Sequence, residues 1–212
     1  VFRDFTPISL LTRAPVILLA NSEVKANTVQ ELINLAKASP GKLNYASTGV
    51  GTQLHMGMEL FKMMTGTDIV HVPYRATTTA MADLLGGRVD LLLASISSAK
   101  AGIDAGKLKA LAIGSERSPM MPNVPTMGES GVPGYSVSSW FGMFGPANLP
   151  ATVMDRLSTA IGQMATDPRF VAAMAPQAMR IVASSPTELR EAVRADSQKW
   201  ADVIKRAGIT IN

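Results

Sequence analysis

The sequence predicts an α/β fold whose sheet is largely parallel. Short apolar runs rich in β-branched residues alternate with stretches in which apolar residues recur at helical spacing, and Gly, Pro or Ser separates the two kinds of segment. Alternation of strands and helices is typical of a parallel sheet covered by helices. The 212 residues, 47% of them hydrophobic, are enough for a sizeable core in one or two domains.

The strands are predicted from apolar runs that are bounded by turn residues. The first two runs could also form one long, bent strand. Residues 69–74 alternate in polarity, which indicates a half-buried strand, whereas 89–94 is apolar throughout, as a buried strand would be. The expected strands are 5–11, 15–20, 43–46, 69–74, 89–94, 107–113, 135–144 and 181–182.

The helices are predicted from apolar spacing together with signals at their ends. Asn27 or Thr28 can cap the first helix, and Ser39-Pro40-Gly41 stops it. The last helix, which is amphipathic, opens with the four residues Ser185-Pro186-Thr187-Glu188. The expected helices are 29–36, 53–64, 77–85, 97–105, 152–165, 168–175 and 185–205, with a short helix at 126–130 inside the Pro-, Met- and Gly-rich connection 118–134.

The turn Ser47-Thr48-Gly49-Val50-Gly51-Thr52 joins a short strand to a helix. A strand, a turn and a helix start place several free backbone N–H groups together, and the helix dipole adds partial positive charge there. Such a turn can hold an anion without Lys or Arg. Its two glycines permit φ > 0 and close approach, and its three hydroxyl residues can donate hydrogen bonds. Thr52 can also cap the helix, and an ordinary cap with a flexible turn is the alternative interpretation.

Several classes of site are excluded by what the sequence lacks. The turn has no Gly-Lys-Ser/Thr ending and no third glycine of a dinucleotide fingerprint. Without cysteines there is no disulfide, thiol catalysis or Cys-ligated zinc. A net charge of +4 arises from interspersed residues, so nucleic-acid binding is not expected. No apolar run suits a membrane helix, and Val1–Phe5 does not resemble a signal peptide. The chain opens abruptly and without Met, as a fragment or a processed form would.

Several further stretches, in one order along the chain, resemble a known family. After the turn come His71-Val72-Pro73-Tyr74-Arg75, Leu84-Leu85-Gly86-Gly87-Arg88-Val89-Asp90 and Pro122-Asn123-Val124-Pro125-Thr126. Ser139-Trp140-Phe141-Gly142 and Lys199-Trp200-Ala201 follow. Together they are similar to the extracytoplasmic receptors of tripartite tricarboxylate transporters, the TctC or Bug family. The resemblance covers nearly the whole chain.

The resemblance implies a type II periplasmic binding protein, in which two α/β lobes with largely parallel sheets close over a carboxylated ligand. It places lobe two at 15–135 and leaves 1–14 and 136–212 as the remnant of lobe one. The family's opening strand and Pro-Phe-x-x-Gly-Gly loop have no counterpart, so lobe one is expected to be incomplete. Apolar surface exposed in this way would predict oligomers, domain exchange or low stability.

The candidate ligand-binding residues combine the turn with positions near strand ends. His55 either faces the ligand or is a hydrogen-bonded core residue, and His71 is expected to be structural. Arg75 follows a strand end, where α/β ligand sites lie, and either pairs with a second carboxylate or is solvated. Two histidines without a carboxylate cluster do not make a metal site, and no cofactor is expected. The candidates are Ser47, Thr48, Gly49, Val50, Gly51, Thr52, His55, Tyr74, Arg75 and Ser95.

The function that we expect is a non-catalytic, periplasmic receptor that passes a small organic carboxylate to membrane permease subunits. Ala94 and Ser95 stand where the resemblance would place an acidic residue, which favours an acid without an amine. The alternatives are an enzyme acting on a small organic acid and a ligand-sensing partner of a signalling protein. Ser47, His55 and Asp90 could be drawn as a triad, but the sequence lacks a Gly-x-Ser-x-Gly elbow.

Overall fold

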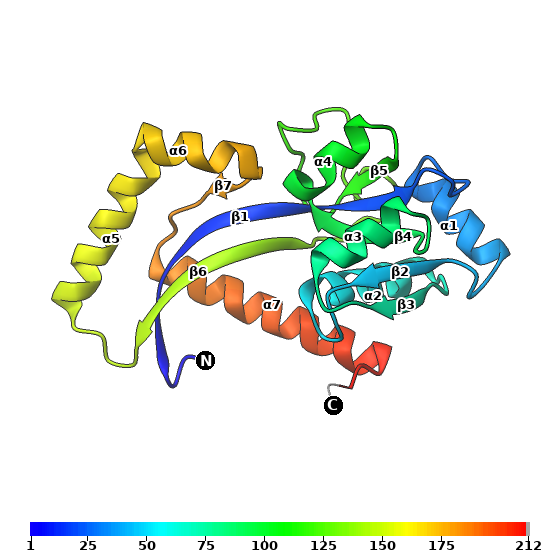
Figure 1. Cartoon of the computed structure of the whole chain (residues 1–212). Helices are drawn as coiled ribbons and strands as arrows, with labels where there is room; N and C mark the ends of the chain where they lie inside the picture. Colours follow the sequence, from blue (N-terminus) through cyan, green and yellow to red (C-terminus); the bar gives the residue numbers. More distant parts are fainter. Residues whose placement is uncertain (211–212) are drawn as a thin grey trace. The chain divides into compact units, whose positions relative to one another are not determined.

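The structure, a computed structural model, describes residues 1–210, and the chain divides into two compact units. Unit 1 consists of Val1–Ala14 and Ser139–Ala201, and unit 2 consists of Pro15–Ser138 with the described residues from Asp202 onward. Figure 1 traces the chain through strands and helices in the alternating order that the sequence predicts. The α/β fold class is therefore confirmed.

The sheet of unit 2 has the strand order β3-β2-β4-β1-β5. Strands β2, β3 and β4 are parallel, as the sequence predicts, whereas β1 is antiparallel to both β4 and β5, so the sheet as a whole is mixed. The two apolar runs expected at 5–20 form the single strand β1, whose later half belongs to unit 2. The strands are β1 (Phe5–Asn21), β2 (Asn44–Ser47), β3 (Val70–Pro73), β4 (Leu91–Ser95) and β5 (Leu108–Ile113).

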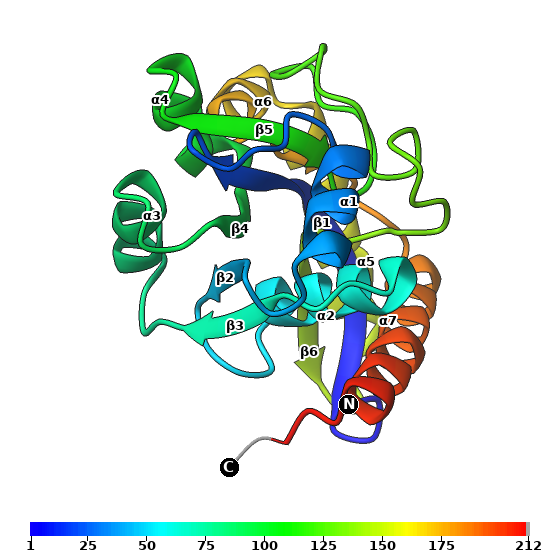
Figure 2. The same cartoon turned by 90° about the vertical axis from the view of Figure 1, so that its right-hand side faces the viewer.

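Helices cover both faces of this sheet. In Figure 2, α3 and α4 lie on one side of the strands, while α1 and α2 lie on the other. Burial on two faces explains why Val16–Ala20 of β1 and Leu91–Ala94 of β4 are apolar and buried without alternation. The helices are α1 (Val29–Ala38), α2 (Gln53–Thr65), α3 (Thr77–Leu85) and α4 (Ile96–Asp104). The apolar positions predicted for the first helix, Val29, Leu32, Ile33 and Ala36, are its buried residues.

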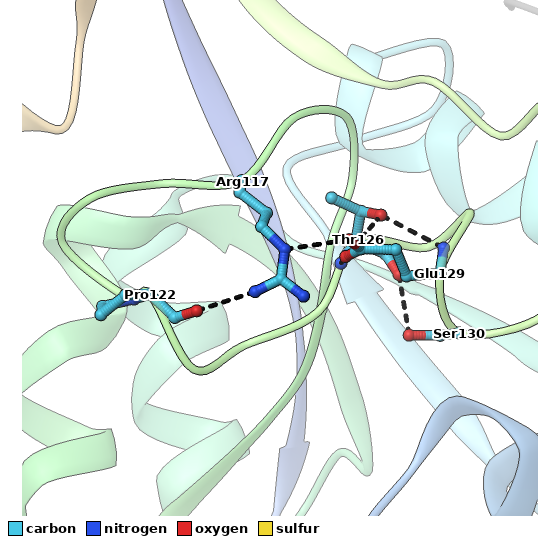
Figure 3. Close-up of polar contacts among 5 residues, drawn as sticks. All are labelled: Arg117, Pro122, Thr126, Glu129 and Ser130. Atoms are coloured by element: carbon cyan, nitrogen blue, oxygen red, sulfur yellow. Dashed lines mark hydrogen bonds and ion pairs between the residues drawn. The ribbon is translucent and has the colours of Figure 1, made fainter.

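The short helix expected at 126–130 is wrong, because this stretch forms turns. Thr126 and Glu129 do make the reciprocal bonds of a capping box, from Glu129 N to Thr126 Oγ1 (3.2 Å) and from Thr126 N to Glu129 Oε2 (2.8 Å). Gly131 has a φ of +93°, which ends the helical course after one turn. Arg117 fastens the connection by donating to Glu129 (2.9 Å) and to the Pro122 carbonyl (2.9 Å), as Figure 3 shows.

Unit 1 contains the early half of β1, to which β6 and β7 pair. Its core includes Leu10, Leu189 and Val193, and Trp140 packs against them while its Nε1 donates to Asp196 (2.7 Å). The last helix opens at Ser185–Glu188 as predicted, and Ser185 and Glu188 form a capping box there. The remaining elements are β6 (Ser138–Pro146), α5 (Ala151–Thr166), α6 (Pro168–Met174), η1 (Ala175–Gln177), β7 (Arg180–Ile181) and α7 (Pro186–Ala207).

Candidate functional site

The carboxyl ends of β2, β3 and β4 lie at one edge of the unit 2 sheet, because these strands are parallel and adjacent. Each strand is followed by a helix, so α2, α3 and α4 all begin at this edge. Helix N-termini carry unsatisfied N–H groups and partial positive charge. Three such ends at one edge favour the binding of an anion there, as expected for open α/β sheets.

The turn from Thr48 to Thr52 connects β2 to α2 at this edge. Gly49 has a φ of +123° and Gly51 a φ of +77°, so both occupy backbone conformations that residues with a side chain rarely adopt. Thr52 is the N-cap of α2, and its Oγ1 accepts from His55 N (3.4 Å) and donates to the Gly49 carbonyl (2.8 Å). The capping role predicted for Thr52 is confirmed, and the capped turn has a defined shape.

Several of the turn's expected anion donors are already engaged within the protein. Gly49 N donates to Ser47 Oγ (3.1 Å), Gly51 N donates to His55 Nδ1 (3.2 Å), and Thr52 N donates to the Gly49 carbonyl (3.3 Å). Among the described residues, the backbone N–H groups of Thr48 and Val50 have no protein acceptor. Val50 is also 47% exposed. The donors that the turn can offer to an anion are therefore the N–H groups of Thr48 and Val50 and the Thr48 hydroxyl.

The candidate residues after β3 and β4 differ in whether their polar groups are already hydrogen-bonded within the protein. Ser95 caps α4, because its Oγ accepts from Ser98 N (3.3 Å). The Tyr74 hydroxyl donates to Asp83 (2.8 Å) on α3, and desolvation together with this bond raises the pKa of Tyr74. Arg75 is exposed and makes no ion pair with any described residue. Arg75 lies near the end of β2, because the residue before it is bonded to that strand: Tyr74 N donates to the Ser47 carbonyl (2.9 Å).

His55 and His71 lie together behind the turn. His55 is 5% exposed, which agrees with the hydrogen-bonded core alternative, and its ring centroid is 4.1 Å from that of His71. His71 Nε2 is 2.6 Å from the hydroxyl of Ser47, which is fully buried. His71 also stacks on Tyr45 with 4.9 Å between centroids, because the two residues are paired in the register of β2 and β3.

A chain of polar side chains that was not predicted from the sequence completes this cluster. The Tyr45 hydroxyl donates to Glu59 Oε1 (2.6 Å), and Lys62 Nζ donates to the same oxygen (2.7 Å). The spacing of His55, Glu59 and Lys62 on one helix, four and then three residues apart, could have revealed a shared polar face. Burial and the bond to Glu59 raise the pKa of Tyr45 far above its ordinary value.

Burial keeps both imidazoles neutral. Desolvation lowers the pKa of His55, an effect that Glu59 opposes and Lys62 reinforces. Desolvation, followed by the neighbouring His55, lowers the pKa of His71 to about 4. At neutral pH each ring therefore carries one unprotonated nitrogen that can accept a hydrogen bond.

The triad drawn from the sequence is not assembled. Ser47 contacts His71 rather than His55. Asp90 braces the opposite ends of the strands, where its Oδ2 accepts from Asn44 N (2.8 Å) and its N donates to Asn44 Oδ1 (3.1 Å). Within residues 1–210, no three His, Cys, Asp or Glu side chains are grouped as metal ligands. Across the same residues, every helix is too short or too polar to cross a bilayer.

The family model of the tripartite tricarboxylate transporter family receptor, TctC, matches residues 1–209. A UPF0065 protein from the tcbD-tcbE intergenic region of Pseudomonas sp. (strain P51) is 32% identical over 99% of this chain and 63% of its own length. Protein BugT of Bordetella pertussis is 33% identical over 98% of this chain and 64% of its own length. The chain thus spans less than two thirds of these curated relatives.

Solved structures with the same fold include ligand complexes. R. palustris Rpa4515 with adipate superposes with a TM-score of 0.85 at 31% identity, covering 98% of this chain and 70% of that one. MatC from Rhodopseudomonas palustris with bound malate gives 0.80 at 29% identity, covering 94% and 69%. The periplasmic binding protein BugD gives 0.81 at 32% identity, covering 97% and 70%. The fold is therefore of the type II periplasmic-binding-protein kind.

Proposed function

The chain belongs to the tripartite tricarboxylate transporter receptor family, and from that premise we propose that it binds a small organic carboxylate at the turn between β2 and α2. The observation that carries this proposal is the pair of N–H groups on Thr48 and Val50, which lack protein acceptors at an edge where three helices begin. A carboxylate there would accept charge-assisted hydrogen bonds, each worth about 1.5–3 kcal/mol.

The other predicted site residues have distinct parts in this proposal. Gly49 and Gly51 shape the turn, Thr52 and Ser95 cap helices, and Arg75 supplies a cation for a second carboxylate. Ser47 and His55 hold the turn from inside, and Tyr74 borders it. Adipate and malate, which the similar structures contain, are dicarboxylates of the size class that we propose.

We further assign residues 15–135 to lobe two of a receptor and 1–14 with 136–212 to lobe one. The family supports a periplasmic, non-catalytic role in which the ligand is passed to permease subunits in the membrane. The engaged hydroxyl of Ser47, which is fully buried, supports the receptor over the enzyme, since a nucleophile must reach its substrate.

Isothermal titration calorimetry on the purified protein tests the carboxylate site. We expect adipate or malate to bind at neutral pH and the corresponding diamides, which keep the shape but lack the charge, to bind far more weakly. The variant Arg75→Gln should weaken the dicarboxylate more than a monocarboxylate of the same length. Equal binding of acids and amides would reject an anion site, and turnover of the bound acid would favour the enzyme.

A further inference from the structure

The two histidines of the chain are bonded to the two ends of the same turn. His55 Nδ1 accepts from Gly51 N (3.2 Å), near the end that leads into α2. His71 Nε2 meets Ser47 Oγ (2.6 Å), and the same hydroxyl accepts from Gly49 N (3.1 Å) at the end that leaves β2. Glycine enters positive φ as readily as negative φ, so the two glycines leave the turn several backbone courses, and these bonds select one of them.

The bond from Gly51 sets the protonation state of His55. A backbone N–H can only donate, so Nδ1 must be unprotonated to accept it, and any proton on the neutral ring resides on Nε2. A doubly protonated His55 would place N–H against N–H at this contact. Because the residue is 5% exposed, the ring cannot turn into solvent without moving α2 or the turn.

From this geometry we propose that His55 and His71 are positioning residues that hold the turn in its anion-binding shape, and that proton uptake by the pair releases the turn and weakens carboxylate binding. The second half of this statement rests on the proposed carboxylate site, whereas the first half does not. Neither ring needs to touch the ligand, since each acts through the backbone at Gly51 or through Ser47.

The charged and titratable groups that face His55 and His71 set the pH at which the two imidazoles become protonated. From α2, Glu59 favours the charged imidazoles and Lys62 opposes them, and these two side chains pair with each other at 2.7 Å. From β2, Tyr45 stacks on both rings and stays protonated, because its hydroxyl donates to Glu59. Each imidazolium repels the other across 4.1 Å. With the pKa of His71 lowered to about 4 and that of His55 also lowered, the neutral pair persists at pH 7 and is lost as the solution is acidified.

Nuclear magnetic resonance tests the positioning role without any ligand. The sequence contains two histidines, so two imidazole signals report both titrations directly. We expect the Gly51 amide signal to shift in step with the titration of His55. In His55→Asn the amide oxygen occupies the place of Nδ1 and cannot titrate, so the Gly51 signal should stay constant over that range. A Gly51 amide that ignores the titration of His55 overturns the proposal.

Malate affinity measured from pH 7.5 to pH 4.5 tests the coupling to binding. His55→Phe should weaken binding by about fivefold to tenfold at pH 7.5, the effect of one lost neutral hydrogen bond, and His55→Asn should recover most of the loss. Comparing wild type with His55→Asn at each pH cancels the ionisation of malate itself, so the ratio of the two affinities should fall on acidification. A ratio that stays constant through the pH range in which the His55 imidazole signal titrates overturns the coupling. A coupled Gly51 signal in a protein that binds neither malate nor adipate keeps the positioning role and rejects the carboxylate site instead.

Discussion

Gly51 combines a φ of +77° with a position one residue before the N-cap of α2. Replacing it with Val should cost about 1–2 kcal/mol in stability, because an L side chain is disfavoured in the left-handed region. Relief of that strain would turn the peptide that joins Val50 to Gly51 and misdirect the donors beside it. We therefore expect Gly51→Val to lower carboxylate affinity while the fold persists, as calorimetry and circular dichroism would record.

Gly66 offers a matched control for this substitution. It ends α2 with a φ of +63°, and a Cβ placed there would meet no atom within 4 Å. Gly66→Val should thus carry a similar strain at the opposite end of the same helix and leave affinity unchanged. If both variants lose affinity equally, the effect of Gly51→Val comes from general destabilisation and not from the turn.

At the level of single residues, the sequence predicted which residues form the turn but not where their hydrogen bonds go. Thr52 was predictable as a cap because capping depends on residues three positions apart. The acceptor for Gly51 N is a ring nitrogen of His55, whose orientation depends on packing against His71 from another strand. That packing follows from the register of β2 with β3, which local patterns do not specify.

Among the helices, α1 and α2 allow the two roles of Thr52 to be separated. Thr28 caps α1 by accepting from Glu31 N (3.1 Å), just as Thr52 caps α2. Each Thr→Ala change should destabilise the protein by about 1 kcal/mol in chemical denaturation. Only Thr52→Ala also removes the hydroxyl bond to the Gly49 carbonyl (2.8 Å) and leaves the turn with the longer bond from Thr52 N (3.3 Å). Only this variant should therefore reduce carboxylate affinity, and Thr52→Ser should restore binding. A loss of affinity in Thr28→Ala would contradict this assignment.

The glycine inside α2 reports how closely the helix packs on its sheet. A Cβ on Gly57 would lie 2.8 Å from Leu93 Cδ1 and 3.2 Å from Val137 Cγ1. Overpacking of this kind costs about 1–3 kcal/mol and should outweigh the roughly 1 kcal/mol that Ala gains over Gly in a helix. We expect Gly57→Ala to lower the melting temperature. Gly162→Ala in α5, where the same Cβ meets nothing within 4 Å, should raise it, and a rise in both would mean that α2 has room to spare.

Element types were predictable wherever local signals agreed with one another. Glycine commonly ends helices, and it stands directly after α2 as Gly66 and after α3 as Gly86-Gly87, while Ser185 with Glu188 opens α7. At 126–130, where a short helix was expected, Thr126 and Glu129 do form a capping box. Gly131 then stops the chain before a second helical turn can form. Local hydrogen bonds start a helix, but continued burial of one face is needed to extend it.

For the whole molecule, alternating elements predicted the α/β fold, but not the direction of β1. Its run of buried residues indicated a strand covered on both faces, which suits any central strand of such a sheet. The antiparallel pairing of β1 with β4 and β5 depends on where the chain enters the sheet, and apolar patterning is the same for both directions. The net charge of +4 is spread along the chain and favours the approach of small anions in general, so it does not identify a ligand.

Selectivity against amino acids follows from the charges at the proposed edge. The segments at the carboxyl ends of β2, β3 and β4, residues 48–52, 74–77 and 95–98, contain no Asp or Glu, and the Ser95 hydroxyl is engaged as a cap. An ammonium group buried there would lack a charged partner, which costs several kcal/mol. We expect succinate to raise the melting temperature more than aspartate does in a thermal-shift series.

Glu116, which follows β5, is the acidic residue to test if aspartate stabilises the protein instead. Loss of that stabilisation in Glu116→Gln would locate the ammonium site, whereas its persistence would require an acceptor from elsewhere in the receptor.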